Sequence, residues 1–382
     1  MAFLQSRAGA ALARAGLYAG AFLGPFGAGI TVAMLPELGT SYGVTPGTAS
    51  LSVTAYFLPF AAVMLFSGAL GERWGRRRTV VVGYAGYVLA SVACILATTF
   101  TLFLAARALQ GVANAFTTPL LLSALGAAAP PNRLGRALGW FGSLQAAGQT
   151  SAPLFGGLAA EADWRFAFAG VAVVAGGLAL IGIPADPAAD GARRERLATA
   201  LRAALRPAVL RIGLASALGW GCLTGLSFMV ALRLEEGFGV GSGPRGLVLT
   251  VAGVAGLLTA RLVGGSVDRI GRRRSVLVGV GIGALVVVGV GALPAVWMVA
   301  VAWALGGIAT QLLLVGVNAM VLGSELGSGG AVSVVQSLRF GGGALSPVAF
   351  TPLYHADPLA GFLVPAALLV TAIPALLPRK PH

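Results

Sequence analysis

Three arginines of this chain lie inside long apolar runs, where a charged side chain is costly: Arg107, Arg261 and Arg339. At bilayer depth an arginine costs about 2.5–3.5 kcal/mol on insertion scales, unless it meets polar partners or a water-filled cavity. Arg107 could therefore handle substrate or protons, or it could snorkel or bond backbone carbonyls. Arg261 is close to a charged loop and could simply extend toward it. Arg339 is deeper, one turn from Gln336, beside glycines and Pro347 that permit a helix bend facing a cavity.

Carboxylates that could carry protons are scarce in the apolar runs. The first run contains no acid, and Glu37 lies just past its end. Pro36 could bend the helix there and turn Glu37 toward a cavity mouth, which makes Glu37 the first candidate for proton coupling. The alternative is a solvated acid at the outer edge of the membrane. Glu235 and Glu236 end the seventh run, and the other acids lie in loops.

Neutral polar and aromatic residues inside the runs could form the walls of a central pathway. Aromatic residues in membrane helices more often pack against lipid or a neighbouring helix, so each one alone is weak evidence. The polar candidates are Asn114, Gln145, Gln149, Gln311 and Asn318, and the aromatic candidates are Tyr18, Phe22, Phe26, Trp140, Trp220 and Trp303.

Signals of catalysis and of cofactor binding are poor. The two histidines, His355 and His382, are far apart, and no acid-histidine cluster suggests a metal site. Cys94 and Cys222 lie in separate apolar runs, which favours buried reduced thiols. No ATP-binding P-loop occurs, so an ion gradient is the expected energy source. We expect no cofactor, no metal and no enzymatic activity.

Composition places the chain in a membrane. Of its 382 residues 57% are hydrophobic and 10% are charged, and the mean hydropathy is +0.88. These values lie outside the usual range of water-soluble domains. The net charge of +14 is dispersed among short loops rather than gathered on one face of a soluble module, so nucleic acid is not an expected partner.

The apolar runs are long enough to cross a bilayer about twelve times, because a helical span needs about 20 mostly apolar residues. A longer polar stretch near the midpoint divides them into two groups of six. We predict an N-terminal six-helix bundle over 1–184, a cytoplasmic linker over 185–208 and a C-terminal six-helix bundle over 209–382. The runs lie near 14–36, 49–71, 79–98, 101–123, 137–159, 165–184, 209–232, 246–267, 275–295, 297–322, 331–354 and 359–378.

Most of the 26 lysines and arginines fall in alternate loops, and Arg165, Arg233 and Arg245 are the exceptions outside the apolar runs. The positive-inside rule therefore predicts that both chain termini are cytoplasmic and that the protein is a multi-pass protein of the cell membrane. The same arginines would meet anionic lipid headgroups of the bilayer.

A charged sequence pattern occurs twice at a constant offset of 196 residues. GALGERWGRRRTVVVG begins at Gly68, and GGSVDRIGRRRSVLVG begins at Gly264. Each copy lies between the second and third runs of its half. A glycine four residues before the acid suits close helix packing, from which the acid could reach a neighbouring helix end, as in a latch. The aligned candidates are Gly68, Glu72, Arg73, Gly75 and Arg76 in the first copy and Gly264, Asp268, Arg269, Gly271 and Arg272 in the second.

The two copies resemble the pattern G-x-x-x-D-R-x-G-R-R-R that the major facilitator superfamily carries after its second helix, with a weaker copy in its second half. Glu72 stands where the family usually has aspartate, which keeps the charge and lengthens the side chain. The resemblance implies that Glu72 and Asp268 help to hold the outward-facing state.

Two further motifs resemble the drug:proton antiporter branches of that family. The fourth run contains RALQG, which supplies Arg107, Gln110 and Gly111, and the resemblance favours a functional role for Arg107. The fifth run contains GWFGSLQAAGQTSAPLFGG, with Ala152 where the family has glycine before the proline. The small residues Gly148, Ala152 and Gly156 share one helix face, which should pack tightly or bend. The residues that fit the fifth-run motif include Gly148, Pro153, Gly156 and Gly157.

We therefore expect an all-α integral membrane protein with about twelve transmembrane helices in two pseudo-symmetric six-helix bundles and a site between the bundles. The resemblance implies a secondary active transporter that exports small amphipathic compounds in exchange for protons by alternating access, working as a monomer. The alternative within transport is an uptake symporter or facilitator for a small polar solute. An enzyme or a receptor on the same fold is a further alternative, distinguished by catalysis or by binding without transport.

Overall fold

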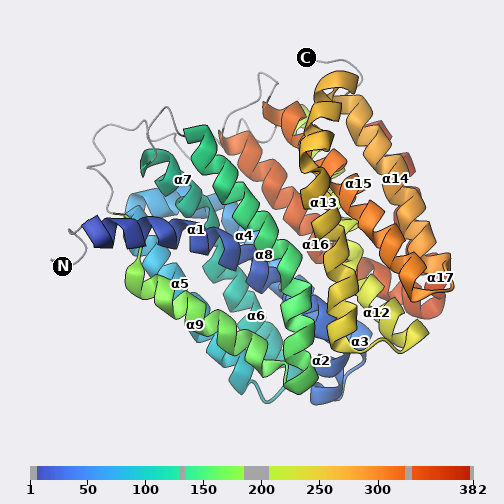
Figure 1. Ribbon diagram of the computed structural model, residues 1–382, viewed down its shortest axis with the longest axis horizontal. Helices are drawn as coiled ribbons and strands as arrows, with labels where there is room; N and C mark the ends of the chain where they lie inside the picture. The colour runs from blue at the N-terminus through green and yellow to red at the C-terminus, as the bar shows by residue number, and fades with distance from the viewer. Residues whose placement is uncertain (1–6, 129–133, 185–205, 323–328, 379–382) are drawn as a thin grey trace.

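The computed structural model describes residues 7–128, 134–184, 206–322 and 329–378, and throughout these ranges the regular secondary structure is helical (Figure 1). The predicted linker over 185–208 falls mainly outside the described residues, and the next helix begins at Pro207. Two six-span bundles result, one from each half of the chain.

The first span of each half is interrupted, so it consists of more than one helix. The first span is α1 (Arg7–Gly29), the short 3-10 helix η2 (Val32–Met34) and α2 (Leu35–Tyr42). The second half opens likewise with α11 (Pro207–Gly221), η4 (Thr224–Leu226) and α12 (Ser227–Phe238). The remaining helices of the first bundle are α3 (Pro46–Ala49), α4 (Leu51–Trp74), α5 (Arg76–Leu96), α6 (Phe100–Ala115), α7 (Thr118–Ala128), α8 (Leu134–Ala162) and α9 (Arg165–Ile181). Those of the second bundle are α13 (Ser242–Ile270), α14 (Arg272–Ala292), α15 (Val296–Leu322), α16 (Gly329–Ala356) and α17 (Pro358–Leu376).

Within the described residues, nine helical stretches are long and apolar enough to cross a membrane, and α9 is a shorter apolar helix. Together with α8 and α16 they provide the spans that the sequence predicts. Between its ends, a helix pairs every backbone N–H with a carbonyl of the same segment, which is what the hydrocarbon core of a bilayer demands. The all-α, two-bundle prediction is confirmed.

The repeated charged pattern forms the same turn in both bundles. Gly75 separates α4 from α5 with a φ of 91°, and Gly271 separates α13 from α14 with a φ of 86°. These backbone angles strain any residue with a Cβ, so the glycine of the pattern is needed for the turn. The hydroxyl groups of Thr79 and Ser275 each donate to the carbonyl of the turn glycine at 3.0 Å. The 196-residue repeat of the sequence is thus a repeat of backbone geometry.

Close helix contacts follow the same offset. A Cβ on Gly111 of α6 would collide with the carbonyl of Tyr56 in α4, and a Cβ on Gly307 of α15 would collide with the carbonyl of Ala252 in α13. Glycine therefore lets the second and fourth spans approach closely in each bundle, as small residues do in membrane helix pairs. This pair of contacts places α6 and α15 in equivalent positions of the two bundles.

The two bundles contact each other mainly at one end. We call this the closed end, at which α2, α3 and α12 lie, and we call the opposite end, with the turns at Gly75 and Gly271, the arginine end. Figure 1 shows α8 and α13 close together at the closed end and apart toward the arginine end. On α8, Gly157 lies against the carbonyl of Ser242, and Gly246 of α13 lies against the carbonyl of Pro153.

The second contact between the bundles joins α4 and α16. The Thr54 hydroxyl donates to the carbonyl of Ala344 at 2.6 Å, and the Ser337 hydroxyl donates to the carbonyl of Ala61 at 2.5 Å. Hydroxyl groups that bond the backbone of a facing helix are common in membrane bundles, where no water competes for the carbonyl. The two bundles thus meet along α8–α13 and along α4–α16.

Candidate functional site

Arg107 lies at the centre of the first bundle with 0% of its surface exposed. Its Nη1 donates to the carbonyl of Gly27 at 3.2 Å and to the Gln110 side chain at 2.7 Å. Its Nη2 donates to the carbonyl of Ala28 at 3.3 Å, and its Nε donates to the carbonyl of Ser52 at 3.5 Å. Because α1 ends at Gly29, two of these acceptors are carbonyls at a helix C-terminus, which have no partner inside the helix.

The Arg107 guanidinium also lies over the Tyr56 ring at 4.5 Å from the ring centroid. A cation is favourable both over an aromatic face and at the negative end of a helix dipole. Of the alternatives that the sequence leaves open for Arg107, bonding to backbone carbonyls is the one seen in this conformation. Arg107 thereby connects the break in the first span to α6 and to the start of α4.

A buried polar network extends from Arg107 along the fourth span. The Gln110 side-chain amide donates to the Ser91 hydroxyl at 2.8 Å, and the Asn114 amide donates to the Tyr56 hydroxyl at 2.8 Å. The Tyr56 and Tyr87 hydroxyls lie 3.3 Å apart. Asn114 is buried, so it belongs to this network and does not face an open cavity here.

The small residues of α8 face two different helices. Gly148 lies against the carbonyl of Phe22, and Gly156 lies against the carbonyl of Ile30, so one face of α8 packs on the first span. Pro153 and Gly157 contact α13 of the other bundle, as described above. The predicted small-residue face therefore packs tightly, and the neighbouring face of the same helix contributes to the contact between the bundles.

The charged residues of the repeated pattern are mostly exposed at the arginine end. Arg73, Asp268, Arg269 and Arg272 are exposed, and the side chain of Glu72 lies outside the described part of the structure. A Cβ on Gly68 or on Gly264 would meet no described atom within 4 Å. Arg76 is half-buried and donates to the carbonyl of Ser123 at 3.3 Å.

An ion pair joins the two bundles at the closed end. The Arg245 side chain, 1% exposed, donates through Nη2 to both carboxylate oxygens of Glu37 at 2.7 Å, and Glu37 is 28% exposed. Arg245 also donates to the carbonyl of Ala33 at 2.7 Å and to the carbonyl of Val240 at 3.0 Å. Glu37 is thus a member of an inter-bundle ion pair, and the sequence did not indicate Arg245 as its partner.

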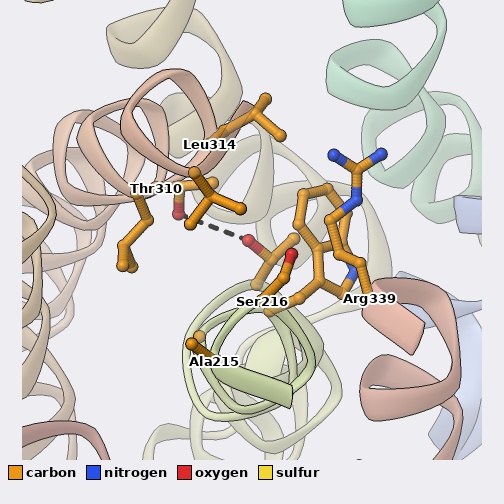
Figure 2. Close-up of a pocket in the computed structure, with 10 residues that line it drawn as sticks. Ala215, Ser216, Thr310, Leu314 and Arg339 are labelled. Carbon is orange, nitrogen blue, oxygen red and sulfur yellow. Dashed lines mark hydrogen bonds between the residues drawn. The ribbon is translucent and has the colours of Figure 1, made fainter. Parts of the chain in front are cut away.

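A cavity opens in the second bundle between α11, α15 and α16 (Figure 2). Its empty volume is about 290 Å³, including space open to solvent. Ser216, Trp220, Thr224, Thr310 and Arg339 are among its lining residues. The Arg339 guanidinium lies 4.9 Å from the Trp220 ring centroid. This cavity offers a cation, an indole face and three hydroxyl groups to a ligand.

The remaining candidates are dispersed. Gln311 on α15 lies near Gly256 of α13, so a Cβ on that glycine would be 3.2 Å from the Gln311 side chain. Gln145, Gln311 and Asn318 are half-buried, and Gln149 is exposed. Arg261 is exposed, in agreement with a side chain that extends from the bundle. Of the predicted aromatic wall, Trp220 is the residue that lines the cavity.

Comparison with known proteins identifies relatives. The sequence profile of the Major Facilitator Superfamily matches residues 17–347. The drug efflux pump JefA of Mycobacterium tuberculosis (strain ATCC 25618 / H37Rv) is 36% identical over 119 residues, which are 31% of this chain and 23% of the relative. The tetracenomycin C resistance and export protein of Streptomyces glaucescens is 30% identical over 188 residues, which are 47% of this chain and 34% of the relative. The matches thus span about a third or less of these relatives' lengths.

The fold is also found among solved structures. The nucleoside transporter NupG superimposes with a TM-score of 0.78 over 96% of this chain and 100% of the solved chain, at 12% sequence identity. A likeness at this identity concerns the fold alone, and it agrees with the two bundles described above.

Proposed function

The chain belongs to the Major Facilitator Superfamily, and from that premise we propose that it is a secondary transporter that exports small amphipathic compounds in exchange for protons. The observation that carries this proposal is the cavity of the second bundle, where an indole face and a cation lie beside Phe340, which stacks on Phe57 of the first bundle. An apolar wall with few polar groups is typical of sites for small organic ligands. The names of the efflux relatives support export as the direction.

Alternating access is part of the proposal. The bundles meet at the closed end and diverge toward the arginine end, which is one of the two arrangements that rocking of rigid bundles requires. Opening of the closed end would separate Glu37 from Arg245 and α8 from α13. In the opposite arrangement Glu72 and Asp268 would approach the facing bundle and stabilise closure at the arginine end. The halves over 1–184 and 209–382 would move as bodies about the linker over 185–208.

The arginine end faces the cytoplasm in this proposal, with both termini on that side of a cell membrane. For single cysteines at Arg77 and Arg273, in a chain whose Cys94 and Cys222 are replaced by alanine, we expect no labelling by an impermeant thiol reagent outside intact cells. A cysteine at Ala356, exposed at the closed end, serves as the control that is labelled. Labelling of either arginine position would contradict the orientation.

Glu37 is the carboxylate that we propose for proton coupling. Its charge lies in the ion pair between the bundles, so a proton on Glu37 would remove the attraction that holds the closed end together. Proton binding would then be linked to the change of conformation, which is what coupling requires. No cofactor takes part in this proposal, and one chain in the bilayer suffices.

The test is transport by the purified full chain in liposomes. With an imposed pH gradient, we expect a drug-sized amphipathic compound to move against its own concentration gradient. With an imposed concentration gradient of the compound and no pH gradient, we expect the compound to drive proton movement. Glu37→Gln should lose the coupled proton movement, whereas Glu236→Gln at the same end should retain it. A parent protein that moves compound without protons would favour the facilitator, and accumulation of a polar solute together with protons would favour the uptake symporter.

A further inference from the structure

Arg339 differs from the two fully buried arginines in its lack of acceptors. Arg107 donates to three carbonyls and an amide, and Arg245 donates to a carboxylate and two carbonyls. The Nε of Arg339 is buried and has no hydrogen-bond partner, and among the residues that the structure describes no carboxylate lies within ion-pair distance of its guanidinium. The Arg339 side chain is half-buried, and its buried Nε is a donor without an acceptor, which is unfavourable until an acceptor reaches it.

The surroundings of Arg339 limit what that acceptor can be. Its guanidinium lies 4.9 Å from the centroid of Trp220 and 4.8 Å from that of Phe340. Figure 2 shows Arg339 beside the same space as Ser216 and Thr310, with its guanidinium on the side of Leu314. The hydroxyl groups of Thr224 and Thr310 are 3.3 Å apart, so either can turn to donate to a ligand oxygen. Within the part of the chain that the structure describes, no acidic residue lines the cavity.

An aromatic surface continues from the cavity across to the first bundle. Phe340 stacks on Phe57 of α4, with centroids 6.0 Å apart and an interplanar angle of 8°, and its ring lies 5.1 Å from that of Phe60. Stacked rings of this kind bind a flat apolar ligand well. Because Phe57 and Phe340 belong to different bundles, movement of the bundles would change this surface, and the affinity for a ligand on it would change with the conformation.

We propose that the transported compounds are amphipathic anions, whose carboxylate, sulfonate or phenolate group binds Arg339 and the nearby hydroxyl groups while a flat aromatic body lies along Trp220 and Phe340. This inference rests on the proposed function, and it narrows the substrate class of the same site. A guanidinium matches the two oxygens of a carboxylate or sulfonate with parallel donors. An organic cation would meet the positive charge of Arg339 without a compensating acid.

The test compares three naphthalene compounds that differ in charge: naphthalene-2-sulfonate, the neutral naphthalene-2-sulfonamide, and a naphthyl trimethylammonium cation. Binding to the purified full chain is measured by calorimetry, and export is measured in liposomes. We expect the sulfonate to bind at least about 10-fold more tightly than the sulfonamide, since a hydrogen bond to a charged group is worth roughly this factor or more.

Arg339→Gln should bring the ratio of the two affinities close to one, while Arg261→Gln should leave it unchanged. Arg261 is the matched control, because it is an exposed arginine on another span, α13, of the same bundle. The ratio compares two ligands on one preparation, so partial misfolding of a variant does not alter it. Arg339→Lys should retain part of the preference for the sulfonate over the sulfonamide. Lysine keeps the positive charge but lacks the parallel N–H donors of the planar guanidinium.

A parent protein that binds the sulfonamide or the cation as tightly as the sulfonate would overturn the inference, as would an Arg339→Gln variant with an unchanged ratio. Export of the cation without export of the sulfonate would leave the export proposal intact and refute the anionic substrate class. Export of none of the three compounds would count against both.

Discussion

Replacing Arg107 by lysine is expected to lower the stability of the protein by about 2–4 kcal/mol and to abolish transport, although the positive charge is retained. The guanidinium supplies donors in several directions to Gly27, Ala28, Ser52 and Gln110, and a single ammonium group cannot reach all four acceptors. Each buried carbonyl left without a donor costs about 1–3 kcal/mol. The hydrogen bonds to Gly27 and Ala28 would be lost at the break between α1 and η2. This break must keep its geometry if the first span is to move with its bundle.

Thermal unfolding of the purified variants, together with transport in liposomes, measures both effects. Arg261→Lys is the control, because Arg261 is exposed and the same substitution there should change neither quantity much. Gln110→Leu should be destabilising as well, since it removes one acceptor of Arg107 and the donor to Ser91. If Arg107→Lys kept the stability and transport rate of the parent, the hydrogen bonds of Arg107 would be needed neither for stability nor for transport.

The repeated elements could be predicted from the sequence because their causes are local. A span follows from its apolar length, and the place of the connection between the second and third spans follows from the repeated charged pattern, whereas the positive-φ turns at Gly75 and Gly271 are seen only in the structure. The tight face of α8 follows from small residues at a spacing of four, and the structure places Gly148 and Gly156 against the first span. Each of these predictions needed information from one stretch of chain.

The partners of the charged residues could not be predicted in this way. Glu37 stood out as the first acid after a span without acids, yet its partner Arg245 is 208 positions away and had been counted only as an exception to the loop charge pattern. Arg107 was noticed for its burial, but its acceptors are backbone carbonyls, which every residue has. Phe340 was not singled out, because its role depends on stacking with Phe57 from the other bundle. Such contacts exist only once the bundles are assembled.

The Glu37–Arg245 pair should control the opening of the closed end, and Glu37→Gln is expected to shift the conformational equilibrium toward opening by about 5- to 150-fold. Removal of one partner of a buried ion pair leaves an uncompensated charge, which costs about 3–5 kcal/mol when both partners are buried. Glu37 is 28% exposed, so water screens part of the interaction and about 1–3 kcal/mol is the expected effect. The variant can relieve the unpaired guanidinium by opening that end to water.

A single cysteine at Ser242 reports this opening, because Ser242 is buried at the closed end and its carbonyl lies against Gly157 of the other bundle. The native Cys94 and Cys222 are buried and are replaced by alanine. The rate of reaction with a thiol reagent should rise in Glu37→Gln by the factor given above. It should remain at the parent's value in Glu236→Gln, whose carboxylate lies 3.9 Å from His355 within one bundle.

The double variant Glu37→Gln with Arg245→Met separates the loss of attraction from the cost of the unpaired guanidinium. Methionine removes the buried charge and keeps an apolar side chain of similar length, so the double variant should open less than Glu37→Gln alone. If the two substitutions instead add, with the double variant the most open, then each side chain stabilises the closed end independently. If neither substitution changes the rate at Ser242, the closed end is held by helix packing between α8 and α13, and Glu37 then cannot link proton binding to opening through this pair.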